Sequence, residues 1–439
     1  MKLKRVAVIF QNNIQYESFI NAVDIMIKRG ILVDLYVPIN NLNNGFNTMF
    51  DAFYNKIANS KYNIYREPTN FYYDIVFETY YIEQFKDLKR KYTIKFMYGL
   101  TAKSEYSFSF DINYIFDAFL CYGKMDAICL QNYGKTFEIG NLKYLNTKLK
   151  PNKIKQKKTI LYLPTYGDNC SIDKIGKEIA LLNGKYDIIV KPHHGTEYLN
   201  NPIETQRMQF LKNNFNTIYS SKDSLEKLME KCDLVISDLS GAVFDSICLG
   251  KPVIMFLANT DSHYGEYKSL PIQFADSGYI LTIDSINCKN LEEIVNKSLK
   301  NDYIKKQQEA FNILFCCKSC ISGEKFSNVL DSIENGEIED DYYLIHKQIK
   351  QEINNLKSTR NEYSILIKEY NILTKEYNDL VKKNEFLIQE NQLLNKKLSS
   401  SYQDVENFKN EINLLHNSTS WKITKPLREF KLIIKRIIN

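Results

Sequence analysis

The sequence predicts an α/β protein of two successive domains, followed by a long helical segment. Up to residue 336, short apolar runs alternate with stretches of helical apolar spacing, which is typical of parallel sheets covered by helices. From Glu337 to Lys425 the chain contains neither Gly nor Pro, and apolar residues recur at 4-3 spacing. We therefore expect domains over residues 1–150 and 151–336, a coiled coil over 337–416 and a separate tail over 417–439.

Composition favours an ordinary globular protein of the cytosol. Of the 439 residues, 44% are hydrophobic and 25% are charged, which is usual for a chain with a sizeable core. No apolar run approaches the ~18 to 20 residues of a membrane-spanning helix, and Val6 to Phe10 is too short for a signal peptide. The nine cysteines have no even spacing, so we expect a reducing compartment.

The first domain is predicted to open as a β-α-β unit. Arg5 to Phe10 has the pattern of a strand, Ile14 to Lys28 that of a helix and Leu32 to Val37 that of the next strand. A later strand is predicted at Ile94 to Tyr98. Open α/β sheets bind ligands at the carboxyl ends of their strands, so Tyr98 is a candidate site residue.

Residues 40–70 have weak periodicity and are expected to form loops and helices. Residues 148–158 contain Pro151 and six lysines, a composition typical of a linker between domains.

In the second domain, three polar loops follow predicted strands. The strands at 159–163, 187–191 and 234–237 run into loops that carry Thr165, His193 and Ser240. Because the ends of parallel strands meet at one edge of a sheet, we expect these three side chains to lie close together.

The turn at Ser240, Gly241 and Ala242 is a candidate phosphate-binding site. A strand followed by a sharp turn and a helix directs backbone N–H groups and the positive end of the helix dipole at the turn. Gly241 would allow a ligand to approach the backbone closely. The alternative is that Ser240 only caps a helix over 242–249 and that Gly250 ends it. The turn alone does not decide between these interpretations.

The ordered motifs of this domain resemble those of the CDP-glycerol glycerophosphotransferase family, the teichoic-acid primases and polymerases. The resemblance covers roughly residues 95 to 330 and includes the end of the first domain, Tyr122 to Leu145. It implies two Rossmann-like domains in the glycosyltransferase B fold, a CDP-activated donor and no cofactor. The motifs are Leu-Pro-Thr-Tyr-Gly-Asp at 163–168, Lys-Pro-His at 191–193 and Ser-Asp-Leu-Ser at 237–240, followed by Phe244-Asp245.

The resemblance also implies roles for individual residues. His193 matches the catalytic histidine of the family's second domain, Thr165 the loop facing the donor, and Asp238 and Asp245 the acidic positions beside the phosphate-binding turn. Lys191, with His193, could supply cationic donors to a phosphate. The alternative for His193 is a buried core histidine.

The chain departs from the family at Met97-Tyr98-Gly99. The family usually has Trp-His-Gly there, and that histidine is thought to be the general base. A tyrosine with a pKa of ~10 is a poor base at neutral pH, so either another group takes the proton or the acceptor differs.

The cluster of Cys316, Cys317 and Cys320 contains one Cys-x-x-Cys pair and no second pair nearby, so no metal site is expected.

The predicted coiled coil has a phase break near Tyr370 to Leu373. Its polar seam positions lower its stability but can fix the register of a homo-oligomer; they are Arg360, Asn384, Asn391 and Ser401. It is interpreted as a spacer or an oligomerisation stalk, and the alternative is a single solvated helix.

The tail at 418–428 resembles the Ser-x-Ser-Trp-x-x-Thr-x-Pro-Leu-Arg ends of bacterial surface-polysaccharide glycosyltransferases. From Pro426, a helix with an apolar side and several Lys and Arg is predicted to bind an anionic membrane surface. The alternative is a helix that docks on a partner protein.

Together these features predict a bacterial transferase on the cytoplasmic face of the membrane, with no nucleic-acid partner. It would transfer glycerol phosphate, or a related group, from CDP-glycerol to a lipid-linked or glycan acceptor. One alternative is a nucleotide-sugar-dependent glycosyltransferase of the same fold. Another is a non-catalytic coiled-coil scaffold with a degenerate transferase head.

Overall fold

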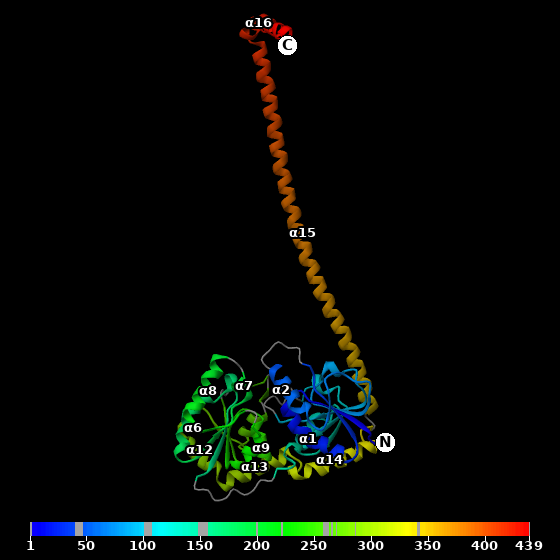
Figure 1. Ribbon diagram of the computed structural model, residues 1–439, viewed down its shortest axis with the longest axis vertical. Coiled ribbons are helices and arrows are strands. Elements are labelled where there is room, and N and C mark those ends of the chain that lie inside the picture. Colours follow the sequence, from blue (N-terminus) through cyan, green and yellow to red (C-terminus); the bar gives the residue numbers. More distant parts are fainter. Residues whose placement is uncertain are drawn as a thin grey trace. The chain divides into compact units, whose positions relative to one another are not determined.

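The computed structural model describes residues 2–39, 47–100, 108–147, 157–198, 201–220, 223–257, 263–264, 267–268, 270–285, 287–339 and 343–438. The chain forms two compact units, Met1–Lys350 and Gln351–Asn439. The first unit contains two α/β domains, each built on its own parallel sheet (Figure 1).

The sheet of the first domain has the strand order β3-β2-β1-β4-β5-β6-β7 in the described residues, and neighbouring strands are parallel throughout. Its centre is fully buried, with Val6, Val8 and Phe77 packed against Phe19 of the first helix. The strands are β1 (Arg5–Ile9), β2 (Leu32–Tyr36), β3 (Asn63–Tyr65), β4 (Tyr72–Glu78), β5 (Lys89–Phe96), β6 (Ala118–Cys121) and β7 (Lys135–Glu138). The helices are α1 (Asn13–Lys28), α2 (Asn47–Ala58), η1 (Glu83–Phe85), α4 (Phe110–Asn113), α5 (Lys124–Leu130) and η2 (Leu142–Tyr144).

The sheet of the second domain has the order β10-β9-β8-β11-β12-β15, again with parallel neighbours. The strands are β8 (Thr159–Leu163), β9 (Asp187–Val190), β10 (Thr217–Ile218), β11 (Leu234–Asp238), β12 (Val253–Phe256) and β15 (Leu281–Ile283), with a separate hairpin of β13 (His263–Tyr264) and β14 (Tyr267–Lys268). The helices are η3 (Gly167–Asn169), α6 (Ile172–Leu181), η4 (Leu182–Gly184), α7 (His194–Tyr198), α8 (Pro202–Asn214), α9 (Leu225–Lys231), α10 (Ala242–Cys248), α11 (Leu270–Asp276), η5 (Asn287–Asn290), α12 (Leu291–Ser298) and α13 (Asn301–Leu314).

After α13 the chain returns to the first domain. Helix α14 (Ser319–Glu334) buries Phe326 and Leu330 in the same core as Phe19, and a carboxylate oxygen of Glu334 accepts a hydrogen bond from the Leu3 N–H at 2.9 Å. Figure 1 shows α14 running beneath α1. The region expected as a second domain over 151–336 therefore ends in a helix that packs on the first. The apolar spacing of α14 predicts a helix but does not reveal which sheet it covers.

Two details of the first domain differ from the expectation. Strand β5 ends at Phe96, so Tyr98 lies in the loop after it. The region expected to be loops and helices also contains the short edge strand β3, whose three residues are too few to show an alternating pattern. The predicted linker lies mostly outside the described residues.

The second unit consists of helix. Helix α15 (Tyr343–Asn417) begins in the first unit and has 75 residues, which at 1.5 Å per residue gives about 110 Å. Helix α16 (Thr419–Ile438) contains Pro426 in its interior, so the expectation that Pro426 starts this helix was wrong. Side-chain hydrogen bonds from Thr424 to the Ser420 carbonyl and from Arg428 to Thr424 support the turns around the proline. No helix in the described ranges is long and apolar enough to cross a bilayer.

Candidate functional site

A cavity of about 390 Å³ lies where loops of both α/β domains meet in the first unit. The first domain contributes the start of α1, the loop after β5 and η2. The second contributes the loops after β8, β9 and β11, whose carboxyl ends share one edge of the parallel sheet. The residues lining the cavity are Asn13, Ile14, Glu17, Tyr98, Gly99, Lys143, Leu163, Pro164, Thr165, Lys191, Pro192, His193, His194, Asp223, Leu225, Ser240, Gly241, Ala242 and Asp245.

The cavity brings together eight of the residues singled out from the sequence. They are Tyr98, Thr165, Lys191, His193, Ser240, Gly241, Ala242 and Asp245. Asp238 is different, because it is fully buried and does not line the cavity. One of its oxygens accepts hydrogen bonds from the backbone N–H groups of Thr165 at 2.6 Å and Ser171 at 3.0 Å. Asp238 therefore holds the Thr165 loop in place, and burial raises its pKa to about 7.

His193 is held in one orientation by its surroundings. The backbone N–H of Gly195 donates to Nδ1 of His193 at 3.0 Å, so the ring proton of the neutral histidine is on Nε2. The ring stacks on Tyr166, with 4.6 Å between centroids. A Cβ atom at Gly195 would lie 2.5 Å from the Tyr166 ring, so only glycine allows this packing.

The charge state of His193 follows from burial. Desolvation, with contributions from His194 and Lys191, lowers the pKa of His193 to about 3. The histidine is therefore neutral near pH 7 and can donate a hydrogen bond through Nε2. Burial also lowers the pKa of Lys191.

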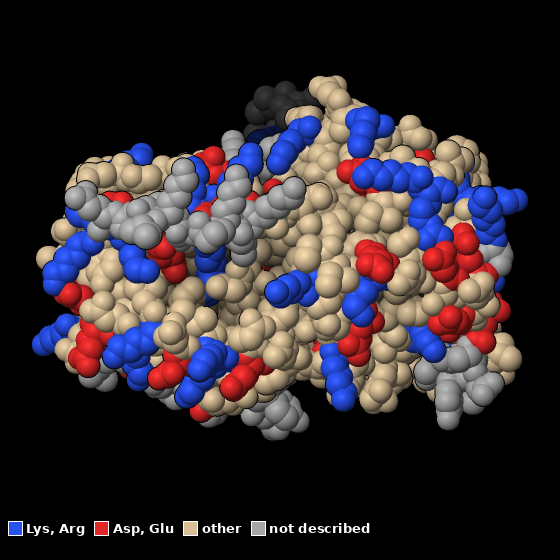
Figure 2. Space-filling view, turned by 90° about the horizontal axis from the view of Figure 1, so that it is seen from below, with Lys and Arg blue, Asp and Glu red and all other residues tan. Residues whose placement is uncertain are grey.

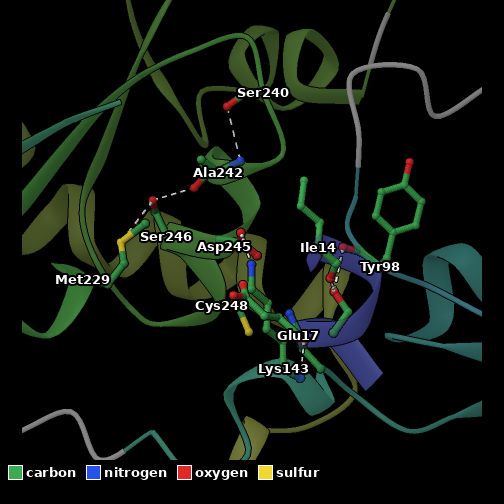
Figure 3. Close-up of polar contacts among 12 residues, drawn as sticks. Ile14, Glu17, Tyr98, Lys143, Met229, Ser240, Ala242, Asp245, Ser246 and Cys248 are labelled. Carbon is green, nitrogen blue, oxygen red and sulfur yellow. Dashed lines mark hydrogen bonds and ion pairs between the residues drawn. The ribbon is translucent and has the colours of Figure 1, made fainter. Parts of the chain in front are cut away.

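The turn at Ser240 has features of both interpretations given above. Ser240, Gly241 and Ala242 all line the cavity, as the phosphate-binding interpretation requires. However, the N-cap of α10 is Gly241, and the Ala242 N–H donates to Oγ of Ser240 at 3.3 Å, so this serine also binds a backbone N–H at the start of the helix (Figure 3). A Cβ at Gly241 would lie 3.1 Å from the carbonyl oxygen of Leu100, so the glycine also permits close contact with the first domain.

Asp245 forms an ion pair across the two domains. Its Oδ2 lies 3.1 Å from Nζ of Lys143, and both side chains are only 13–16% exposed (Figure 3). The carboxylate therefore holds a first-domain cation at the cavity wall. Asp245 alone would repel a phosphate. In the ion pair, the positive charge of Lys143 lies beside the carboxylate and offsets that repulsion.

Tyr98 lines the cavity but is unsuited to accept a proton. Its hydroxyl lies 3.1 Å from that of Tyr80, and burial raises its pKa well above the ordinary value. The carbonyl oxygen of Tyr98 accepts a hydrogen bond from Ser18 of α1 at 3.1 Å. The tyrosine thus joins the loop after β5 to α1.

Sequence reasoning missed the first-domain residues Asn13, Glu17 and Lys143. Asn13 and Glu17 are at the start of the helix that follows β1, a position that could have suggested a site. Lys143 is in η2, where no motif marks it. Within the described ranges, no three His, Cys, Asp or Glu side chains are grouped so that they could hold a metal ion.

Charged residues outside the cavity form no large region of one sign on the face shown in Figure 2. Lys and Arg are interspersed with Asp and Glu there, around a stretch of uncharged surface.

Comparison with solved structures shows the fold. A Listeria monocytogenes protein described as a UDP-N-acetylglucosamine 2-epimerase superimposes with a TM-score of 0.50 at 15% identity, covering 78% of this chain and 98% of that one. S. aureus MnaA with UDP gives 0.49 at 14% identity, with coverage of 76% and 96%. The wall teichoic acid polymerase TagF gives 0.47 at 15% identity, with coverage of 80% and 90%. The expected pair of Rossmann-like domains in a glycosyltransferase B arrangement, followed by a long helix, is confirmed.

Comparison with protein families addresses the activity. No curated protein matches the sequence. Residues 122–335 match the family described as CDP-Glycerol:Poly(glycerophosphate) glycerophosphotransferase. This segment contains every second-domain loop of the cavity and confirms the resemblance drawn from the motifs. Residues 122–335 are thus similar to the CDP-glycerol:poly(glycerophosphate) glycerophosphotransferase family, and this similarity points to a transferase of that type.

Proposed function

We propose that the chain transfers glycerol phosphate from CDP-glycerol to a lipid-linked or glycan acceptor in the synthesis of a cell-surface polymer. The observation that carries this proposal is the cavity itself. In the segment that matches the family, His193, Lys191 and the Ser240 turn face groups of the first domain across a space of about 390 Å³. A nucleotide donor bound to the second domain would thus present its phosphates to an acceptor entering from the first.

The reaction needs positioning and charge stabilisation. An acceptor hydroxyl attacks the β-phosphorus of the donor, the bond from that phosphorus to the CMP oxygen breaks, and negative charge develops on the phosphoryl oxygens. Lys143 and Lys191 can offset this charge from opposite domains, and neutral His193 can donate a hydrogen bond from Nε2 to the same group. Fixed donors in a partly buried cavity are more effective than donors in water.

The main alternative is a nucleotide-sugar-dependent glycosyltransferase. Tyr98 at the position of the family's first-domain histidine favours it, because the acceptor chemistry of the family would then be altered. A non-catalytic scaffold with a degenerate transferase head is the third candidate. The three candidate functions differ in which nucleotide donor binds the cavity and in whether that donor is converted to product.

Calorimetry with CDP-glycerol and UDP-N-acetylglucosamine tests the donor. We expect CDP-glycerol to bind the wild type, and Lys191→Met to weaken binding by tenfold or more because it removes a cation from the cavity. Lys185→Met is the matched control, since Lys185 is exposed on the same domain and pairs with Glu292. Preference for the UDP-sugar would instead support the glycosyltransferase.

The proposal includes self-association through α15. Leu373, Leu380, Leu387 and Leu394 recur every seven residues, and each is 46–66% exposed. With these leucines at heptad position d, Asn384 and Asn391 fall at position a. In a parallel, in-register dimer each asparagine meets its counterpart, whereas in an antiparallel pair it would face leucine with its amide unsatisfied.

Charge supports the same parallel arrangement. In the heptad register set by the leucines, Asp404 is at position g and Lys409 at the following position e. These positions face each other between the chains of a parallel coiled coil, so opposite charges would meet. We therefore infer that the partner of α15 is a second copy of this chain.

The proposal also places α16 on the inner face of a bacterial membrane. Ile423, Leu427 and Phe430 are 64–71% exposed. Between Trp421 and Asn439 there are six Lys or Arg and one Glu. Exposed apolar side chains beside several cations suit an anionic lipid surface. A parallel dimer would place two such helices at the same end of the stalk, which strengthens binding through avidity.

A further inference from the structure

Among the described residues that line the cavity, the first domain contributes no histidine, because His193 and His194 both belong to the second domain. Tyr98 is hydrogen-bonded to Tyr80, and Nδ1 of His193 already accepts the Gly195 N–H. Resting on the function proposed above, we propose that the carboxylate of Glu17 is the general base of the transfer. It would replace, from a different element, the histidine that the family has in its first domain.

Glu17 is one of three carboxylates that line the cavity. Asp245 is paired with Lys143 at 3.1 Å. Asp223 is on the second domain and accepts the Ser220 N–H at 2.7 Å. Glu17 alone comes from the first domain, where an acceptor is expected to enter, and its helix turn also presents Asn13 and Ile14 to the cavity.

Hydrogen bonds fix the orientation of the Glu17 carboxylate. Nζ of Lys56 donates to Oδ1 of Asn13 at 2.8 Å, and Nδ2 of Asn13 donates to Oε1 of Glu17 at 2.6 Å. Because an ammonium group can only donate, Lys56 sets the direction of the Asn13 amide and directs its NH₂ group to the carboxylate. Within the described part of the chain, Oε2 of Glu17 accepts no protein hydrogen bond, so it is available to a ligand.

Glu17 and Lys191 line the same cavity from opposite domains. Burial lowers the pKa of Lys191, and the charge of Glu17 opposes that lowering more than any other group does. The carboxylate therefore lies within electrostatic range of a lysine on the opposite domain. An acceptor hydroxyl between them would have a base on one side and the donor phosphorus on the other, which is the geometry that direct displacement needs.

The proton balance of the step is simple. The acceptor hydroxyl forms an O–P bond to the β-phosphorus, and its proton passes to Oε2 of Glu17. The bond between that phosphorus and the CMP oxygen breaks, and CMP leaves with the electron pair. Glu17 then releases the proton to solvent, so the step balances without an oxidant or a further reactant.

Turnover of CDP-glycerol on a short poly(glycerol phosphate) acceptor tests Glu17. Glu17→Gln keeps the size of the side chain and an oxygen for Asn13, so we expect kcat to fall by ~10² to 10⁴ with the donor Kd unchanged. In Glu17→Ala, added formate or azide should restore part of the rate, because a small anion can act as base in the space left by the side chain. Asp24→Asn is the control, since Asp24 is another α1 carboxylate and pairs with Lys61.

The outcomes separate the two proposals. If the wild type turns over and Glu17→Gln is equally active, the role of Glu17 alone is overturned. The same holds if a folded Glu17→Ala protein shows no change in rate when formate or azide is added. A wild-type protein that releases no CMP from CDP-glycerol would overturn the proposed function and this step together.

Discussion

The backbone N–H of Gly195 donates to Nδ1 of His193 at 3.0 Å, which leaves the Nε2 proton directed away from the main chain. With its pKa lowered to about 3, this histidine stays neutral at physiological pH. His193 is therefore suited to donate a hydrogen bond to a phosphoryl oxygen and unsuited to act as a base or as a permanent cation.

The donor role predicts a difference between two substitutions. The amide nitrogen of glutamine can reach the position of Nε2, so His193→Gln should lose only about tenfold in turnover, whereas His193→Ala should lose ~10² or more. Steady-state rates of both variants, with circular dichroism as the check on folding, make the comparison. Equal losses in the two variants would argue against donation from Nε2.

The same histidine predicts a pH effect on stability. The unfolded chain protonates it below about pH 6.5, whereas the folded chain does so only near pH 3. Between these values the unfolded state binds more protons, so His193 makes the protein less stable as the pH falls, by at most about 1.4 kcal/mol per pH unit.

Thermal unfolding of the wild type and His193→Gln at pH 7 and pH 5 measures this effect. Because the variant lacks the titrating group, its stability relative to the wild type should increase at pH 5. A difference between the two proteins that stays constant with pH would mean that His193 is not buried in its neutral form.

The second-domain half of the site could be predicted from the sequence because it depends on local rules. Thr165, His193 and Ser240 each follow a parallel strand, and parallel strands place such loops at one edge. Asp238 was expected beside the ligand because it lies at the end of a strand. The sequence does not show that its side chain turns inward to the Thr165 loop.

The first-domain half depends on how the two domains dock, and no periodicity encodes that. Glu17 and Lys143 reach the cavity only because α1 and η2 face the second domain across it. The return of α14 to the first domain has the same origin, since its apolar stripe fits either sheet. Long-range contacts of this kind are set by shape and packing rather than by local pattern.

Helix α15 is predicted to hold two copies of the chain together. A chain ending at Lys350 keeps the first turns of α15, including the ion pair of Lys350 with Asp117 at 3.2 Å, but loses the heptads. Light scattering should show a dimer for the full chain and a monomer for the shortened one. An unchanged mass would contradict the coiled coil.

The asparagine pairs make a second, finer prediction for the stalk. Replacing Asn384 and Asn391 with Val should raise the thermal stability of the α15 assembly but allow shifted registers, because the polar pairs that fix the register are gone. A variant that keeps one parallel register would show that other positions fix it.

Helix α16 is predicted to bind the chain to an anionic membrane surface. A chain ending at Asn417 should stay soluble with anionic liposomes that retain the full chain, and retention of the full chain should weaken as salt rises. Turnover on a short, water-soluble acceptor should be nearly the same for both proteins. Equal sedimentation of the two chains would place the membrane contact elsewhere.

The most direct test of the central claim measures nucleotide release. The full-length protein is incubated with a short poly(glycerol phosphate) acceptor and either CDP-glycerol or UDP-N-acetylglucosamine, and the products are separated by anion exchange. We predict CMP from CDP-glycerol, with one CMP formed per glycerol phosphate added to the acceptor, and no UDP from the nucleotide sugar. Release of UDP without CMP, or no release of either nucleotide, would contradict the account.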